Sequence, residues 1–230
     1  MSPVVAAPGA EPPLDARERL LDATEALIYA GGIHATGVDA IVREAGAARK
    51  SFYTWFKSKN ELVATALQRR DERWMRWFVD GTLKRGRMPG ARLIGMFDVL
   101  REWFASDGFH GCAFLNAAGE TASPDDPVRL VAFEHKARLL AFVREQCDAH
   151  MAANGMDRRH AARLARQWLI LIDGAIGVAL VSGDADAALD ARAAAKQLLD
   201  ALTRARTSSR RSLSRSPARR AARSPEKEHE

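Results

Sequence analysis

The chain has 230 residues and a formal net charge of +6, with 47% hydrophobic and 28% charged residues, which fits one large or two small globular domains. Two cysteines exclude a disulfide scaffold, and no uninterrupted apolar run reaches the ~18 residues of a membrane span. The N-terminus lacks the basic and apolar regions of a secretory signal. We therefore expect a cytoplasmic globular protein.

Both ends of the chain are expected to be disordered. Residues 1–13 are rich in Ala and Pro, and residues 207–230 are rich in Ser, Arg and Pro. The last 27 residues hold eight Arg and one Lys against three Glu, which accounts for the whole net charge. This tail is either a sequence-independent binder of nucleic-acid phosphates or a solubilising appendage, and the sequence leaves both open.

The part between the tails is predicted to be all-α, with about nine helices, because β-branched residues are sparse and alternating patterns are absent. The first helix opens with Asp15 as N-cap and Glu18 three residues on, an arrangement typical of a capping box. It ends at Gly31-Gly32, where a positive φ is cheap.

Two short helices with a tight turn between them come next. Residues 38–45 carry apolar side chains at helical spacing, Gly46 supplies a turn, and residues 48–56 bring Phe52 and Phe56 to one inward face. This pattern predicts a helix-turn-helix. The sequence S-K-N-E at residues 58–61 predicts a second capping box, which opens a long fourth helix.

The second short helix leaves a basic and aromatic face outside. No acidic residue lies between Glu44 and Glu61, whereas four basic ones do. The outward residues are Arg49, Lys50, Ser51, Tyr53, Thr54 and Trp55. Such a face suits DNA, because cations and hydroxyls reach phosphates and base edges. A solvated face would explain the charges but not the exposed aromatic rings. Lys59, at a helix N-terminus, is either a phosphate ligand or a plain surface lysine.

The segments GIHATGVDAI (32–41), EAG (44–46) and SFYTWFKSKNEL (51–62) resemble the DNA-binding domain of TetR-type (TetR/AcrR) transcriptional repressors. The resemblance covers residues 14–74, which we predict to form the three-helix helix-turn-helix domain. It implies that the start of the recognition helix enters the major groove and that neighbouring residues hold phosphates. The implied DNA-binding positions are Thr36, Gly37, Val38, Ala48, Arg49, Lys50, Ser51, Tyr53, Thr54, Trp55 and Lys59. Ala48, Gly37 and Trp55 depart from the residues usual in the family.

Residues 75–206 are predicted to form a helical effector-binding and dimerisation domain. Aromatic and Met side chains gather here and line either a ligand cavity or an ordinary core; the resemblance favours the cavity. Three polar residues within apolar runs either orient a ligand or are satisfied by the protein. The candidate pocket residues are Trp74, Trp77, Phe78, Met96, Phe97, Trp103, Phe114, Asn116, His135 and Asp173.

The last two predicted helices, at residues 164–181 and 189–202, are rich in Ala and Gly. The resemblance implies that they form a four-helix dimer interface; alternatively they close the core of a monomer. Two Cys/His pairs are too weak a pattern to predict a metal site, and no motif of a cofactor or a catalytic site is present.

The sequence thus predicts a homodimeric, sequence-specific transcriptional regulator at the nucleoid, and not an enzyme. We expect a repressor that leaves a palindromic operator when a small apolar or aromatic effector binds. The alternative is a nonspecific nucleic-acid-binding protein that acts through its Arg-rich tail.

Overall fold

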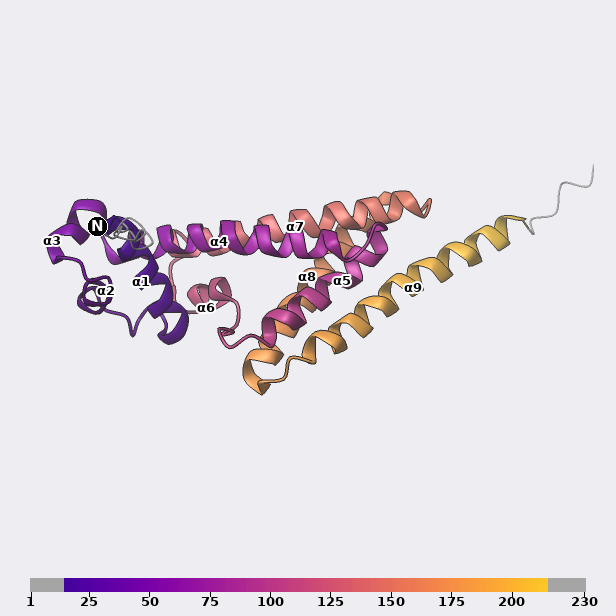
Figure 1. Cartoon of the computed structure of the whole chain (residues 1–230). Coiled ribbons are helices and arrows are strands. Elements are labelled where there is room, and N and C mark those ends of the chain that lie inside the picture. The colour runs from indigo at the N-terminus through magenta and orange to yellow at the C-terminus, as the bar shows by residue number, and fades with distance from the viewer. Residues whose placement is uncertain (1–14, 215–230) are drawn as a thin grey trace, which may run out of the picture.

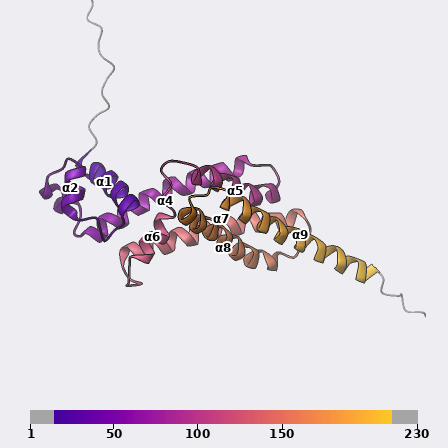
Figure 2. The same cartoon turned by 90° about the horizontal axis from the view of Figure 1, so that it is seen from below.

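The computed structural model describes residues 15–214, and over that range it is helical with no strand, which confirms the predicted all-α class (Figure 1). The elements are α1 (Ala16–Gly31), α2 (Val38–Glu44), α3 (Arg49–Trp55), α4 (Lys59–Lys84), α5 (Pro89–Phe104), α6 (Ala113–Gly119), α7 (Pro127–Ala153), a 3-10 turn η1 (Arg158–His160), α8 (Ala161–Ser182) and α9 (Ala187–Ser214). Figures 1 and 2 show α1–α3 at one end of an elongated molecule and α9 projecting at the other.

A small hydrophobic core holds α1, α2 and α3 against the first turns of α4. It consists of Leu20, Leu21, Ala23, Ile41, Ala45, Phe52, Phe56, Leu62 and Ala66. Phe52 and Phe56 are both buried, as their spacing predicts. Gly46 has φ +55°, a conformation that other residues rarely adopt, and it makes the turn between α2 and α3. Helices of seven residues are unstable alone, so this shared core is what keeps α2 and α3 folded.

The two predicted capping boxes have different outcomes. Ser58 caps α4 as expected, its Oγ accepting from the Glu61 backbone N–H at 3.1 Å, while the Glu61 carboxylate accepts from the N–H of Lys57 instead of Ser58. At α1 the prediction is wrong, because Asp15 is the N-cap residue but its side chain makes no capping hydrogen bond. The Glu18 carboxylate turns away from the helix end to bind arginines.

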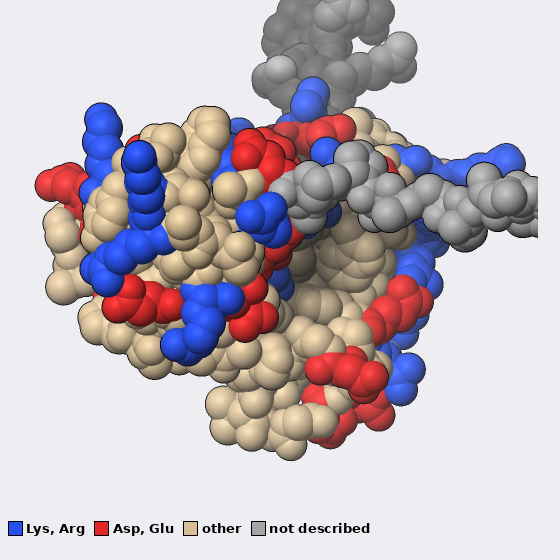
Figure 3. Space-filling view, turned by 60° about the vertical axis from the view of Figure 1, so that its left-hand side comes forward, with Lys and Arg blue, Asp and Glu red and all other residues tan. Residues whose placement is uncertain are grey.

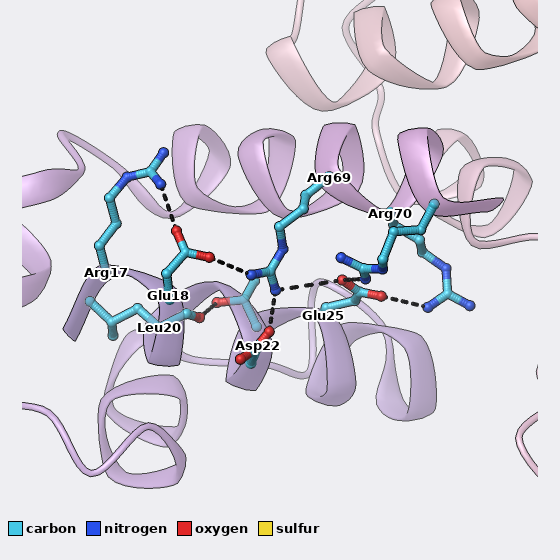
Figure 4. A network of polar contacts seen from close by, with 9 residues as sticks. Arg17, Glu18, Leu20, Asp22, Glu25, Arg69 and Arg70 are labelled. Atoms are coloured by element: carbon cyan, nitrogen blue, oxygen red, sulfur yellow. Dashed lines mark hydrogen bonds and ion pairs between the residues drawn. The ribbon is translucent and has the colours of Figure 1, made fainter. Parts of the chain in front are cut away.

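Ion pairs fasten α1 to α4. Arg69 of α4 binds Glu18 at 2.8 Å and also Asp22, and Glu25 receives Arg70 at 2.9 Å (Figure 4). Arg70 also lies over the ring of Tyr29, with its guanidinium carbon 3.7 Å from the ring centroid. Several charges in one network hold a geometry better than a single exposed pair does. The helix-turn-helix therefore sits firmly on α4.

A second, larger core occupies the rest of the molecule. There α4 packs along α7, and α5, α8 and α9 complete the bundle (Figure 1). Trp168 of α8 is fully buried and donates its indole N–H to the Leu93 carbonyl of α5 at 3.1 Å. Because α4 belongs to both cores, it is the covalent link between them, and Ile28 of α1 also packs into the larger core.

The C-terminal helix is longer than the sequence predicts. We expect disorder from residue 207, but α9 continues as a helix to Ser214. The reason is local: residues 207–214 contain no Pro or Gly, and the first Pro of the tail is Pro217. The predicted disorder of residues 1–13 and the phosphate-binding role of the last residues of the tail lie outside the described range.

The segment Arg158–Ser182 is apolar enough by length and composition to cross a membrane, with a mean hydropathy of 1.6, contrary to the sequence prediction. Core helices of globular proteins pass the same test, and Trp168 and Ile172 of α8 are fully buried in the bundle. The face of α8 opposite Trp168 and Ile172 is apolar too: Ile170, Val178 and Val181 are exposed, and Val181 is 88% exposed.

Candidate DNA-binding site and its connection to the bundle

The outer face of α3 is solvent-exposed. Tyr53 and Trp55 are 58% and 46% exposed, while Phe52, which precedes Tyr53, is buried in the core. The exposed residues of this face are Ala48, Arg49, Lys50, Tyr53, Thr54 and Trp55, and Ser51 is half-buried. In Figure 3, which turns this end of the molecule forward, Lys and Arg side chains project from it. The structure thus brings these predicted residues together on one convex, basic surface that a major groove can accept.

Arg49 is held in place by two neighbours. Its guanidinium binds Asp39 of α2 at 2.6 Å and lies 6.0 Å from the centroid of the Tyr53 ring. The hydrogen bond with Tyr53 and the charge of Asp39 raise the pKa of Arg49. Sequence reasoning did not assign a role to Asp39. The signal in the sequence is a carboxylate on the short helix that precedes a basic segment, because such a carboxylate can orient a basic side chain of the next helix.

Three other predicted phosphate ligands donate hydrogen bonds to backbone carbonyls of the protein itself. The Thr36 hydroxyl donates to the Gly32 carbonyl at 2.7 Å, and Thr54 donates to Lys50 at 2.9 Å. The Lys59 ammonium donates to the carbonyls of Ile33 and Thr36 at 2.9 and 3.1 Å. These two bonds use two of the three N–H groups of the Lys59 ammonium. Gly37 and Val38 lie at the start of α2, where Gly37 is the N-cap residue.

Helix α6 and its flanks connect the bundle to the helix-turn-helix at two points. The Glu120 carboxylate accepts from the backbone N–H groups of Ile33 and His34 at 2.9 and 2.7 Å, and it lies 3.2 Å from the His34 ring. On the other side of α6, the Tyr29 hydroxyl donates to the Gly111 carbonyl at 3.0 Å. Burial by itself raises the pKa of Glu120, but these hydrogen bonds outweigh it and lower that pKa.

Most of the predicted effector-pocket residues form a packed aromatic cluster. Trp74 stacks on Phe78 with centroids 4.9 Å apart and meets Trp103 edge-on at 5.7 Å. Phe114 stacks on His135 at 3.7 Å. Met96, Phe97 and Phe78 are fully buried. In this structure the cluster is part of the hydrophobic core, which is the alternative to a ligand cavity that the sequence left open.

Two candidates lie apart from the cluster, and a third lies at its edge. Asn116 donates to the His110 carbonyl at 3.1 Å and faces α1. Trp77 contacts the rings of Trp74 and Trp103, with centroids 6.0 and 6.2 Å away, and borders a surface groove of about 500 Å³ between α4 and α5. Asp173 is paired with Lys136 at 2.5 Å. The ten residues therefore do not line a single pocket.

One polar group that sequence reasoning overlooked lies inside the bundle. Asp71 of α4 is buried, with its carboxylate 2.7 Å from Nδ1 of His135 and bound to Arg138. The sequence did contain a signal: residues 67, 71, 75, 78 and 82 form the buried stripe of α4, and a charge within such a stripe requires a partner. No group of three or more metal-ligating side chains occurs among the residues from 15 to 204.

Comparison with known proteins shows to which family the chain belongs. The sequence model described as "Bacterial regulatory proteins, tetR family" matches residues 20–66. A second model, "Transcriptional regulator LmrA/YxaF-like, C-terminal domain", matches residues 89–207, more than half of the chain. The chain belongs to the TetR family. It is therefore a DNA-binding transcriptional regulator of the helix-turn-helix type.

Individual relatives agree with this assignment to the TetR family. An HTH-type regulator from the lacX 3' region of Lactococcus lactis is 30% identical over 49% of this chain and 58% of its own length. The regulator YxaF of Bacillus subtilis is 25% identical over 74% of this chain and 87% of its own. Among solved structures, a TetR-type regulator from Streptomyces avermitilis has a TM-score of 0.71 at 32% identity, covering 83% of this chain and 99% of its own. A TetR-family regulator from Streptomyces coelicolor reaches 0.72 at 26% identity, covering 81% and 95%.

Proposed function

We propose that this TetR-family regulator reads a palindromic operator by inserting α3 into the major groove. The observation that carries the proposal is the exposed face of α3, where Arg49 is held by Asp39 and Tyr53 beside a buried Phe52. Arginine is the commonest reader of guanine edges, and an orienting carboxylate reduces the conformational freedom it loses on binding. Lys50, Thr54 and Trp55 contact the backbone of the DNA.

The regulator acts as a twofold homodimer through α8 and α9. The exposed stripe of α8 consists of Ile170, Gly174, Gly177, Val178 and Val181. A Cβ added at Gly174 or Gly177 would meet nothing within 4 Å, so both glycines face open space and leave room for a second helix at short range. An apolar stripe on a helix already buried on its other side supports a symmetric interface. Two recognition helices then face two half-sites.

The regulator is a repressor, and a small apolar or aromatic effector releases it from DNA. The aromatic cluster around Trp74 borders both α4 and α6, the two elements that contact the helix-turn-helix. A ligand that enters this cluster must displace packed rings, and it shifts the population only by its preference for the displaced form. Such a regulator works in the cytoplasm, at the nucleoid.

Footprinting on genomic fragments tests DNA recognition. A discrete palindrome is expected, and Arg49→Ala and Tyr53→Phe should each weaken operator binding, the arginine change by about 10–100-fold. Lys84→Ala is the matched control, because it removes an exposed positive charge from the far end of α4. Operator binding that is insensitive to the α3 changes would refute the assignment. Uniform coverage of DNA would instead favour nonspecific binding through the Arg-rich tail.

Sedimentation velocity tests the dimer. Val178→Arg places a charge in the α8 stripe and should yield monomers that bind operator poorly. Leu83→Arg is the control, because Leu83 is an equally apolar exposed residue on α4. A dimer that survives Val178→Arg would show that the interface lies elsewhere. Release of operator by aromatic compounds, followed by fluorescence anisotropy, tests the effector class.

A further inference from the structure

An aromatic side chain of α7 lies on the surface and takes no part in either core. Phe133 is 71% exposed, more than Tyr53 on the outer face of α3. Leu130, Ala137 and Ala141 are exposed on the same helix. These four residues of α7 are three or four positions apart, so they follow one face of the helix. They are called the α7 stripe below.

The α7 stripe runs beside the exposed stripe of α8. A short connection joins the end of α7 to the start of α8, and the two helices pack along each other in opposite directions. The Lys136 ammonium lies 2.5 Å from the Asp173 carboxylate, which fixes their register. Residues that precede Lys136 are therefore level with residues that follow Asp173, and Phe133 lies near the level of Gly177. The two stripes form one apolar surface across both helices.

The outer face of α9 does not continue this surface. Its exposed side chains include Asp190, Arg192 and Lys196. Arg192 is paired with Asp98 of α5 at 3.2 Å, and Lys196 is paired with Asp200 at 2.9 Å. The apolar surface of the bundle therefore extends from α8 toward α7, whereas the side toward α9 is charged.

The shape of the α7–α8 surface suits a second copy of itself. Phe133 and Ile170 are large exposed side chains, whereas a Cβ added at Gly174 or Gly177 would meet nothing within 4 Å. A surface that carries both projecting side chains and a hollow can pack against its own copy about a twofold axis. In the seam between the stripes Lys136 and Asp173 neutralise each other, so a partner that covers them buries no unpaired charge.

The rest of the sequence supplies little to cover this surface. Residues 215–230 contain no Val, Ile, Leu, Met or aromatic residue, so they bring no large apolar side chain to it. Residues 1–14 do contain Val4, Val5 and Leu14, and the experiment below separates them from a second copy. A contiguous apolar patch with balanced charge is typical of a protein–protein interface and gives a strongly charged partner no advantage.

We propose that the second subunit of the dimer covers the α7 stripe together with α8, and that Phe133 is an anchor of the interface. The proposal deepens the proposed function and rests on the dimer described there, in which α7 had no part. Aromatic side chains are enriched in the buried centres of interfaces and carry much of the binding energy. Burying Phe133 removes the largest exposed ring of α7 from water.

Sedimentation velocity on the full-length protein measures the contribution of Phe133. Phe133→Ser should raise the dissociation constant of the dimer by about 30-fold, the effect of losing one interface anchor. Leu83→Ser is the matched control, because it removes an exposed apolar side chain from α4, and it should leave the constant unchanged. An unchanged constant in Phe133→Ser would overturn the proposal.

Thiol labelling with N-ethylmaleimide shows whether α7 itself is covered. The native Cys112 and Cys147 are both buried, so an introduced surface cysteine reacts first. Ala137→Cys lies in the α7 stripe, and Ala152→Cys is an exposed control on the same helix. Labelling of Ala137→Cys should be several-fold slower in the dimer than in protein diluted to monomers, with no such difference at Ala152→Cys. Equal rates at Ala137→Cys in dimer and monomer would overturn the proposal.

Other outcomes separate this inference from the proposed function. If Val178→Arg dissociates the dimer but Ala137→Cys stays reactive in it, the proposed dimer through α8 stands and the α7 contact is refuted. If Phe133→Ser dissociates the dimer but Val178→Arg does not, the α7 contact stands and the proposed role of the α8 stripe is refuted. If Ala137→Cys is protected in the monomer and deletion of residues 2–14 abolishes that protection, the N-terminal segment covers α7, which overturns the proposal.

Discussion

Replacing Glu120 by Gln removes one charge from the contact between α6 and the helix-turn-helix and changes the side chain's shape very little. In the wild-type protein both carboxylate oxygens accept backbone N–H groups, from Ile33 and His34. The amide of Gln keeps one acceptor and turns an NH₂ group toward the other N–H. One charge-assisted hydrogen bond is lost, and two donors are left facing each other.

A hydrogen bond to a charged group contributes about 1.5–3 kcal/mol. The Glu120 side chain is 28% exposed, so solvent screening reduces this, and we expect Glu120→Gln to lower the free energy of unfolding by about 1–2 kcal/mol. For a chain of this length that corresponds to a fall in Tm of about 3–6 °C. Glu134→Gln, an exposed carboxylate on α7, is the control and should leave Tm within about 1 °C.

The contribution of Glu120 to the free energy of unfolding depends on pH in a direction that can be tested. The pKa of Glu120 is lowered in the folded protein from the ordinary 4.5, so its stabilising contribution is complete above about pH 4.5. It disappears as the pH falls through the lowered pKa. Differential scanning calorimetry should therefore show wild-type protein above Glu120→Gln at neutral pH, with the gap closing in acid. A gap of zero at neutral pH, or one that widens in acid, would refute the reasoning.

Substitutions at three further positions probe other parts of the fold. Ser58→Ala removes the N-cap of α4 and should cost about 1 kcal/mol in thermal unfolding, whereas Ser58→Asp should retain most of the stability. Phe52→Ala opens a cavity in the small core and should cost about 3–5 kcal/mol; hydrogen exchange should speed up in α1–α3 and stay slow in α8. Trp168→Phe removes the buried indole N–H that binds the Leu93 carbonyl, and it also shortens a fully buried ring, so it should cost about 1–3 kcal/mol by urea denaturation.

The helix-turn-helix follows from the sequence because its determinants are local. Gly46 permits a turn that other residues resist, and Phe52 and Phe56 are one helical turn apart, so one face must be buried. Side chains with competing partners escape this kind of reasoning. Glu18 is a good capping residue by position, but Arg69 lies 51 residues away in sequence and close in space, and the ion pair replaces the cap.

Some features of the candidate site can be predicted from local sequence, and others depend on how the helices pack. The exposed face of α3 can be read from helical periodicity alone, whereas the bond between Arg49 and Asp39 depends on how α2 and α3 cross. The aromatic residues before and within α6 are visible in the sequence, but composition does not decide between cavity and core. The meeting of Asp71 and His135 depends on the packing of α4 against α7, which no local pattern encodes.

The length of helix α4 determines how far a small rotation inside the bundle displaces the helix-turn-helix. Its 26 residues span about 39 Å at a rise of about 1.5 Å each. The ion pairs from Arg69 and Arg70, with the Lys59 ammonium on the carbonyls of Ile33 and Thr36, make the small domain turn with it. A rotation of about 5° about the far end of such a rod carries the near end through about 3.4 Å, the rise of one base pair. Register along a groove can therefore be lost through a tilt smaller than the scatter of ordinary helix crossing angles.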